Sequence, residues 1–211
     1  MRLQDLSETL HTRASERPAG RDDGVLRAIL GRRSVSPKRL HAPGPGRAEI
    51  ELMVAAAAAA PDHCGLRPWR FLRIADDARG ALADLFADAK RRRAPQAHPS
   101  ELDRERERAL RAPAMLAVVA WLEEGHPRVS VHEQYVSAGA AIQNVLLAAA
   151  ALGYGAMIVS GAKTRDTGLR RALRLDEAET LIGFICIGTP AGPAKVRARP
   201  EVSEILSEWN G

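Results

Sequence analysis

Residues 60–71 of the chain read APDHCGLRPWRF and form a sharp break between an alanine-rich segment and a short hydrophobic one. Pro61 ends the preceding helical pattern, because proline lacks the backbone N–H that a helix interior needs and clashes with the preceding turn. A turn needs only proline or glycine, yet this one also carries His63, two arginines and a tryptophan. We therefore interpret it as part of a binding site as well as a turn.

The histidine and cysteine of this turn do not predict a metal site or a nucleophile. A lone turn histidine such as His63 more often satisfies a backbone carbonyl than it binds a ligand, and no HxxxH, CxxC or HxxE spacing accompanies it. Cys64 stands directly beside it, but neighbours in sequence seldom form a catalytic pair. We expect no metal and no side-chain nucleophile.

Outward from the turn, apolar periodicity predicts helices alternating with strands. Helical spacing of apolar residues favours helices over 23–31, 47–60, 76–90, 101–111, 131–152 and 165–173. Short apolar runs favour strands over 69–75, 113–122, 156–160 and 181–187. The charged helix over 101–111 is expected to face solvent. This alternation indicates a chain with both α and β structure around one central sheet.

Length and composition limit the kind of protein. The 211 residues suit one domain, which we expect over 23–211, with 1–22 as a polar N-terminal extension. Lys plus Arg outnumber Asp plus Glu by 31 to 26, but the excess is scattered, so nucleic acid is not an expected partner. Two separated cysteines and the lack of a signal-peptide or membrane-span pattern favour a reduced, cytoplasmic protein.

Two arginine clusters could bind a phosphate. Arg32 and Arg33 precede Ser34, and their guanidinium groups suit charge-assisted bidentate bonds to a phosphate. The plainer interpretation is that positive charge at a helix C-terminus is favoured by the helix dipole. Arg197 and Arg199 form a second basic pair far along the chain. A phosphate held from both ends of the chain would explain both clusters, and the two interpretations stay open.

A glycine after the predicted strand over 156–160 is a second candidate ligand contact. Gly161 follows Ser160 and either caps the strand or lets the backbone approach a ligand and present its N–H groups. No GxGxxG and no GxxxxGK[ST] is present, so a Rossmann dinucleotide site and a P-loop are not supported.

Five motifs together resemble a known family. They are Arg32-Arg33-Ser34; Ala60-Pro61-Asp62-His63 followed by Arg67-Pro68-Trp69-Arg70-Phe71; Leu152-Gly153-Tyr154-Gly155; Ser160-Gly161; and Gly183-Phe184-Ile185-Cys186-Ile187-Gly188-Thr189-Pro190. Their order and spacing, from about Val25 to Pro200, resemble the nitroreductase family of FMN-dependent flavoproteins, and within it a compact branch of NAD(P)H nitroreductases.

The resemblance implies an α+β fold with a central, mainly antiparallel sheet flanked by helices, in an intertwined homodimer with FMN at the subunit interface. It implies that Arg32, Arg33 and Ser34 hold the phosphate and ribityl chain with Arg197 or Arg199, and that His63 reaches FMN from the other subunit. It implies that the isoalloxazine ring lies against Ile158, Val159, Ser160 and Gly161.

The implied activity is a ping-pong transfer of hydride from NADH or NADPH through FMN to a nitroaromatic, quinone or other electrophilic acceptor. FMN carries that chemistry, so no catalytic side chain is expected. Ala59 stands where relatives have a polar or basic residue, which removes one implied contact between subunits. Two alternatives stay open: another flavin reaction on the same fold, such as dehalogenation or flavin breakdown, and a non-catalytic flavin-binding or regulatory protein.

Overall fold

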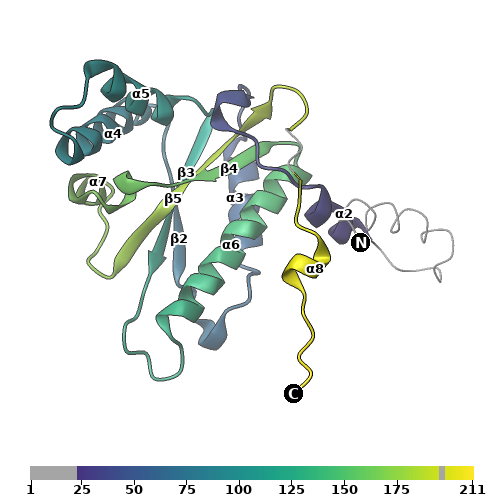
Figure 1. Cartoon of the computed structure of the whole chain (residues 1–211). Coiled ribbons are helices and arrows are strands. Elements are labelled where there is room, and N and C mark those ends of the chain that lie inside the picture. The colour runs from purple at the N-terminus through teal and green to yellow at the C-terminus, as the bar shows by residue number, and fades with distance from the viewer. Residues whose placement is uncertain (1–22, 195–197) are drawn as a thin grey trace. The chain divides into compact units, whose positions relative to one another are not determined.

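The computed structural model describes residues 23–194 and 198–211 (Figure 1). The chain divides into two compact units, Met1–Arg33 with Ala194–Gly211, and Ser34–Pro193. The expected extension over 1–22 and the candidate Arg197 lie outside the described residues.

The larger unit is built on one antiparallel sheet with helices on both faces (Figure 1). Its strands are β1 (Leu40–His41), β2 (Trp69–Arg73), β3 (Ala114–Trp121), β4 (Gly155–Val159) and β5 (Glu179–Pro190). Its α-helices are α3 (Arg47–Ala57), α4 (Arg79–Arg93), α5 (Pro99–Leu110), α6 (Val131–Ala151) and α7 (Thr167–Ala172). The strand order is β1-β5-β3-β2, with β4 also paired to β5, and each of these pairs is antiparallel. The expected central antiparallel sheet is therefore confirmed.

Strand β3 is buried on both faces, as its continuous apolar sequence predicts. Leu116 pairs with Ile185 of β5, and both lie in the core that the sheet forms with α3 and α6. The next pair, Ala117 with Phe184, points to the opposite face because strand side chains alternate. There Phe184 meets Phe86 of α4 edge to face, with ring centroids 5.1 Å apart. The sheet thus has a core on each face.

Several element boundaries differ from the prediction. Helix α3 ends at Ala57 rather than at residue 60, because a residue before proline avoids the helical region and the last alanines form shorter turns. The segment over 165–173 divides at Asp166, whose carboxylate caps α7 by accepting a bond from the Leu169 N–H at 2.8 Å. Strand β5 exceeds 181–187 at both ends because it pairs with three strands.

The helix over 101–111 was predicted to face solvent, and this is only partly right. Its α5 counterpart buries Glu105 and Ala109 against the rest of the larger unit. Alternating charges along a helix predict exposure, but they do not show which charged residue finds a buried partner.

The smaller unit contains α2 (Gly24–Gly31) and α8 (Val202–Ile205) within its described part. The helix expected to end at Gly31 is confirmed. Helix α8 has only 4 residues, and Trp209 lies beyond it with 91% of its surface exposed.

Cys186 of β5 is buried in the sheet, and we expect its thiol to make stability fall at high pH. Burial raises the pKa of Cys186 from 9.0 to about 11, although Arg79 and Lys163 nearby oppose the shift. Between these values the folded state keeps a proton that the unfolded chain loses. Within that pH range the free energy of unfolding should therefore fall by about 1.4 kcal/mol per pH unit.

Urea unfolding at several pH values measures this slope, and the variant Cys186→Ala should lose the thiol's share of it. Cys64 is an exposed, free cysteine, so Cys64→Ala is the matched control and should keep the wild-type slope. Equal slopes in all three proteins would show that the buried thiol does not titrate as expected.

Candidate functional site

Three arginines of the smaller unit gather at the C-terminal end of α2. Arg33 Nη1 donates to the carbonyl oxygens of Leu30 and Arg32, at 2.8 and 3.1 Å. Arg199 Nη2, from the other end of the chain, donates to the same two oxygens at 2.8 and 3.2 Å. All three arginine side chains are partly buried. Arg199 therefore lies beside Arg32 and Arg33 within this unit, and the phosphate-binding role expected of them stays a prediction.

The electrostatics of this cluster suit an anion. Burial lowers the pKa of Arg199, and the charges of Arg33 and Arg32 lower it further. Like charges at close range disfavour one another, and a phosphate between them would relieve that repulsion. The same guanidinium groups also satisfy carbonyls that the end of α2 leaves unpaired, as the plainer interpretation expects. The arginine cluster can therefore both bind an anion and cap the C-terminal end of α2.

In the larger unit, the candidate ring contacts form one continuous segment at the end of β4. Ile158 and Val159 are half-buried strand residues, and Ser160 and Gly161 are exposed. Gly161 has φ 121° and ψ −176°, a backbone region that is essentially restricted to glycine. A β-carbon placed there would have no atom within 4 Å. Backbone conformation, rather than crowding, therefore requires glycine at this position.

A second glycine of the matched motifs holds β4 close to β5. A β-carbon on Gly183 would lie 2.6 Å from the carbonyl oxygen of Val159. No side chain fits that gap, so Gly183 permits the pairing that carries β4 to Gly161.

The turn over 61–68 is closed by its own residues. The Asp62 carboxylate accepts a hydrogen bond from the backbone N–H of Arg67 at 2.6 Å. Cys64 and Arg67 adopt positive φ values of 65° and 49°, which side-chain-bearing residues rarely do. Such strain often accompanies a functional turn. Here Cys64 lies within the short 3-10 helix His63–Gly65, and Arg67 lies just after it.

His63 has a partner that the sequence did not reveal. Its Nδ1 lies 3.2 Å from Oε1 of Glu133, and both side chains are about half exposed, at 54% and 50%. The other oxygen of Glu133 accepts bonds from the N–H and the hydroxyl of Ser130 in the capping box of α6. Bonds from Ser130, and then from His63, lower the pKa of Glu133. An ionised carboxylate thus holds the imidazole on one side.

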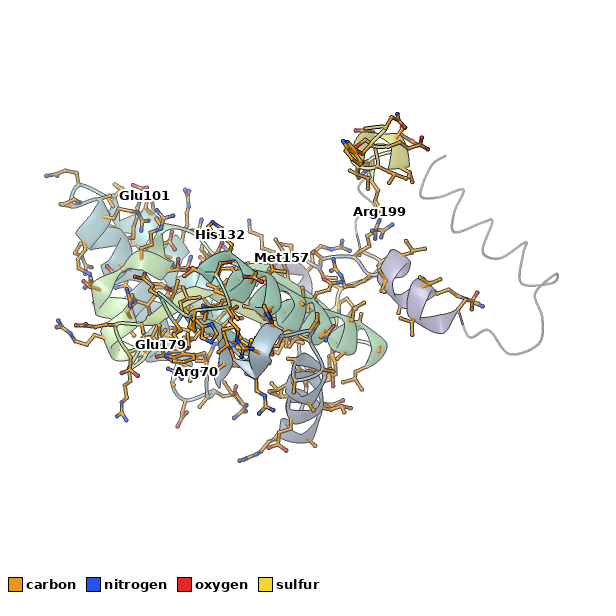
Figure 2. The ribbon with its side chains drawn as sticks, turned by 90° about the horizontal axis from the view of Figure 1, so that it is seen from below. Arg70, Glu101, His132, Met157, Glu179 and Arg199 are labelled. Carbon is orange, nitrogen blue, oxygen red and sulfur yellow. The ribbon has the colours of Figure 1, made fainter. Side chains whose placement is uncertain are left out.

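Arg70, from the stretch over 60–71, has a structural role. Arg70 of β2 reaches across β3 and forms a two-pronged ion pair with Glu179 of β5 (Figure 2). Glu179 is 5% exposed, and the bonds from Arg70 lower its pKa. The pair connects β2 to β5 across β3, so the position of Arg70 is explained without a ligand.

Two kinds of feature are absent from the described part of the chain: clusters of metal-ligating side chains and helices able to span a membrane. Within 23–194 and 198–211, no three His, Cys, Asp or Glu side chains are grouped as ligands for a metal ion. Over the same residues, no helix has both the length and the apolar character needed to cross a bilayer.

Taken together, these features define an α+β protein with a basic cluster suited to a phosphate-bearing ligand. The model of the nitroreductase family matches residues 29–189, which is most of the chain. The chain therefore belongs to the nitroreductase family. The expected family and fold are confirmed.

Individual relatives agree with this assignment. The chain is 33% identical over 166 residues to the Escherichia coli protein named "Putative NAD(P)H nitroreductase YdjA", covering 79% of this chain and 88% of that protein. It is similar to the crystal structure of a "putative nitroreductase" from Desulfovibrio desulfuricans in complex with FMN, with a TM-score of 0.69, 28% identity and coverage of 90% and 99%. A nitroreductase-like protein from Bacillus cereus shares the fold, with a TM-score of 0.75, 20% identity and coverage of 92% and 100%.

Proposed function

We propose that this protein is an FMN-dependent oxidoreductase that passes electrons from NADH or NADPH to a nitroaromatic, quinone or other electrophilic small molecule. The observation that carries the proposal is the meeting of Arg32, Arg33 and Arg199 at the end of α2. The names of the relatives support both the nicotinamide donor and FMN. When bound, FMN supplies the two-step hydride transfer that no side chain of this protein needs to perform.

The arginines and Ser34 hold the phosphate end of FMN in this proposal. The guanidinium groups supply charge and paired donors, and the exposed Ser34 hydroxyl follows them directly in sequence. Arg197 was predicted beside Arg199, and it stays a candidate for the same role. The fit is chemical: three partly buried cations near one helix end favour a dianion.

The segment from Ile158 to Gly161 lies along the isoalloxazine ring in this proposal. Ile158 and Val159 supply apolar contact, and the exposed backbone of Ser160 and Gly161 presents N–H groups to the ring. Fixed N–H donors stabilise negative charge that develops on a bound ring, and they do so without reorganising. The absence of a side chain at Gly161 leaves that backbone open to a flat ligand.

We further propose that residues 23–211 act as one FMN-binding domain in an intertwined homodimer, with His63 of each subunit contacting FMN held mainly by the other. Exposed apolar side chains support a partner chain: Val25, Leu26 and Ile29 of α2 are 67%, 47% and 41% exposed. Burying such side chains is the main favourable term in association. Ala59 offers no polar side chain to this interface.

We also propose that the protein is cytoplasmic. Cys64 and Cys186 are free thiols, one exposed and one buried, as expected in a reducing compartment.

The purified protein is expected to be yellow and to oxidise NADH or NADPH when a quinone or a nitroaromatic compound is present. Without oxygen, adding NADH or NADPH should bleach the visible flavin bands, and adding the acceptor should restore them. The two half-reactions measured separately test the ping-pong order. A colourless protein that fails to bind added FMN would overturn the proposal, and a yellow protein that never oxidises either nicotinamide would favour a non-catalytic flavin carrier.

A further inference from the structure

A charged side chain is buried two residues beyond the glycine of the candidate ring contact. Lys163 lies in the 3-10 helix η4 (Ala162–Arg165), and only 7% of its surface is exposed. Among residues 160–166 it is the single buried residue. A lysine is almost never buried this far without a partner that compensates its charge.

The partners of Lys163 come from the two helices on that face of the sheet. Its Nζ lies 4.9 Å from the ring centre of Phe86 on α4, which is a cation–π distance. The same atom is 3.8 Å from Oε2 of Glu105 on α5, and Glu105 is itself only 8% exposed. The ammonium group is therefore held between α4 and α5.

The charges around this ammonium are mixed. Burial lowers the pKa of Lys163, the carboxylate of Glu105 raises it, and the nearby Arg108 and Arg93 lower it. Arg108 also donates to the other oxygen of Glu105. Glu105 is thus shared between Arg108 of its own helix and the buried Lys163, which it ties to α5.

Lys163 is also joined tightly to Gly161 through the backbone. The N–H and the hydroxyl of Thr164 both donate to the Gly161 carbonyl at 3.0 Å. The N–H of Asp166 donates to the Lys163 carbonyl at 3.0 Å. The turn from 161 to 166 is therefore one hydrogen-bonded unit. It is anchored by the buried side chain of Lys163 and, at its end, by the two-pronged ion pair of Asp166 with Arg92 of α4.

We propose that Lys163 is a positioning residue for the flavin contact: its ammonium group, held by Glu105 and Phe86, fixes the exposed backbone of Ser160 and Gly161. The flavin contact itself rests on the function proposed above. Lys163 acts only through the turn, and it links the orientation of that turn to the pair of helices α4 and α5. Loss of its charge should leave the sheet intact and loosen the backbone donors at the ring.

The test compares the variants Lys163→Met and Lys163→Arg with the wild-type protein. Methionine keeps an unbranched apolar chain and removes the charge, whereas arginine restores a cation. For Lys163→Met we expect FMN affinity to fall about tenfold, because binding must then order a turn that the ammonium group no longer holds in place. The visible flavin absorption bands should shift as well, and Lys163→Arg should recover part of both properties.

A matched control is available between the same two helices. Lys90 of α4 forms a 2.9 Å ion pair with Glu101 of α5, and neither residue is among the partners of Lys163 described above. Lys90→Met removes an equivalent charge, so it should leave FMN affinity and the flavin bands unchanged. If the substitutions only loosened α4 against α5, Lys163→Met and Lys90→Met would both bind FMN less tightly and show shifted flavin bands. A change in Lys163→Met alone supports the positioning role.

If Lys163→Met fails to fold, the variant Glu105→Gln tests the proposal in its place. Glutamine keeps the shape of the side chain and removes the negative charge that pairs with Lys163. A shift of the flavin bands in Glu105→Gln supports the proposal. Wild-type affinity and bands in the folded Lys163→Met variant, or in Glu105→Gln when the methionine variant is unfolded, overturn it. If the wild-type protein does not bind FMN at all, the proposed function fails instead, so the two failures are distinguishable.

Discussion

Replacing Arg33 and Arg199 together with alanine is expected to release FMN while the protein stays folded. Each arginine supplies a charge-assisted bond to a phosphate in the proposed site, and such bonds contribute about 1.5–3 kcal/mol each. Losing two of them corresponds to roughly a 10²- to 10⁴-fold fall in affinity. Titration of the flavin-free protein with FMN, followed by fluorescence, measures the change directly.

The controls for this variant separate phosphate binding from helix capping. Both arginines also bond the carbonyls of Leu30 and Arg32, so alanine removes those contacts too. Lysine at both positions keeps the charge without the paired donors, and we expect intermediate affinity from it. The double variant Arg128→Ala with Arg171→Ala removes the same charge from exposed positions and should bind FMN normally.

Unchanged FMN affinity in the Arg33→Ala, Arg199→Ala variant would contradict the phosphate assignment. If its melting temperature fell at the same time, the arginines would be established as capping groups for α2. Lower affinity in a protein that stays folded is the result that the proposal predicts.

The sheet could be predicted from the sequence because its signals are local. The apolar run that became β3 and the long apolar helix that became α6 were placed within a residue or two of their ends. Their signals are strong because burial on both faces leaves few polar residues. Boundaries set by capping or pairing were placed less well, as the early end of α3 and the full length of β5 show.

The candidate site could be predicted only where its residues are unusual for a purely structural role. Two arginines before a serine and a glycine after a strand stand out in the sequence, and they pointed to the cluster and the turn described above. Glu133, the partner of His63, and Glu105, the partner of Lys163, do not stand out in the sequence. Charged residues typical of a surface give no local sign of a distant contact. The same limit concealed the structural ion pair of Arg70.

Gly161→Ala is expected to lower both the stability of the protein and its affinity for FMN. A β-carbon would meet no atom within 4 Å, so the effect comes from the backbone, whose φ of 121° and ψ of −176° disfavour any side chain. The cost of holding alanine there is about 1–3 kcal/mol. The free protein can escape part of that strain by moving the turn, but the bound ring needs the original geometry, so the remainder should appear as weaker FMN binding.

Gly80→Ala is the matched control for this prediction. Gly80 lies near the start of α4 in an ordinary helical backbone, and a β-carbon added to it would likewise meet no atom within 4 Å. Alanine there should stabilise the protein slightly, by up to about 1 kcal/mol, and leave FMN binding unchanged. Urea unfolding and FMN titration of both variants give the comparison. If Gly161→Ala matched Gly80→Ala in both measurements, the turn would tolerate a side chain, and the proposed close approach of its backbone to the ring would be wrong.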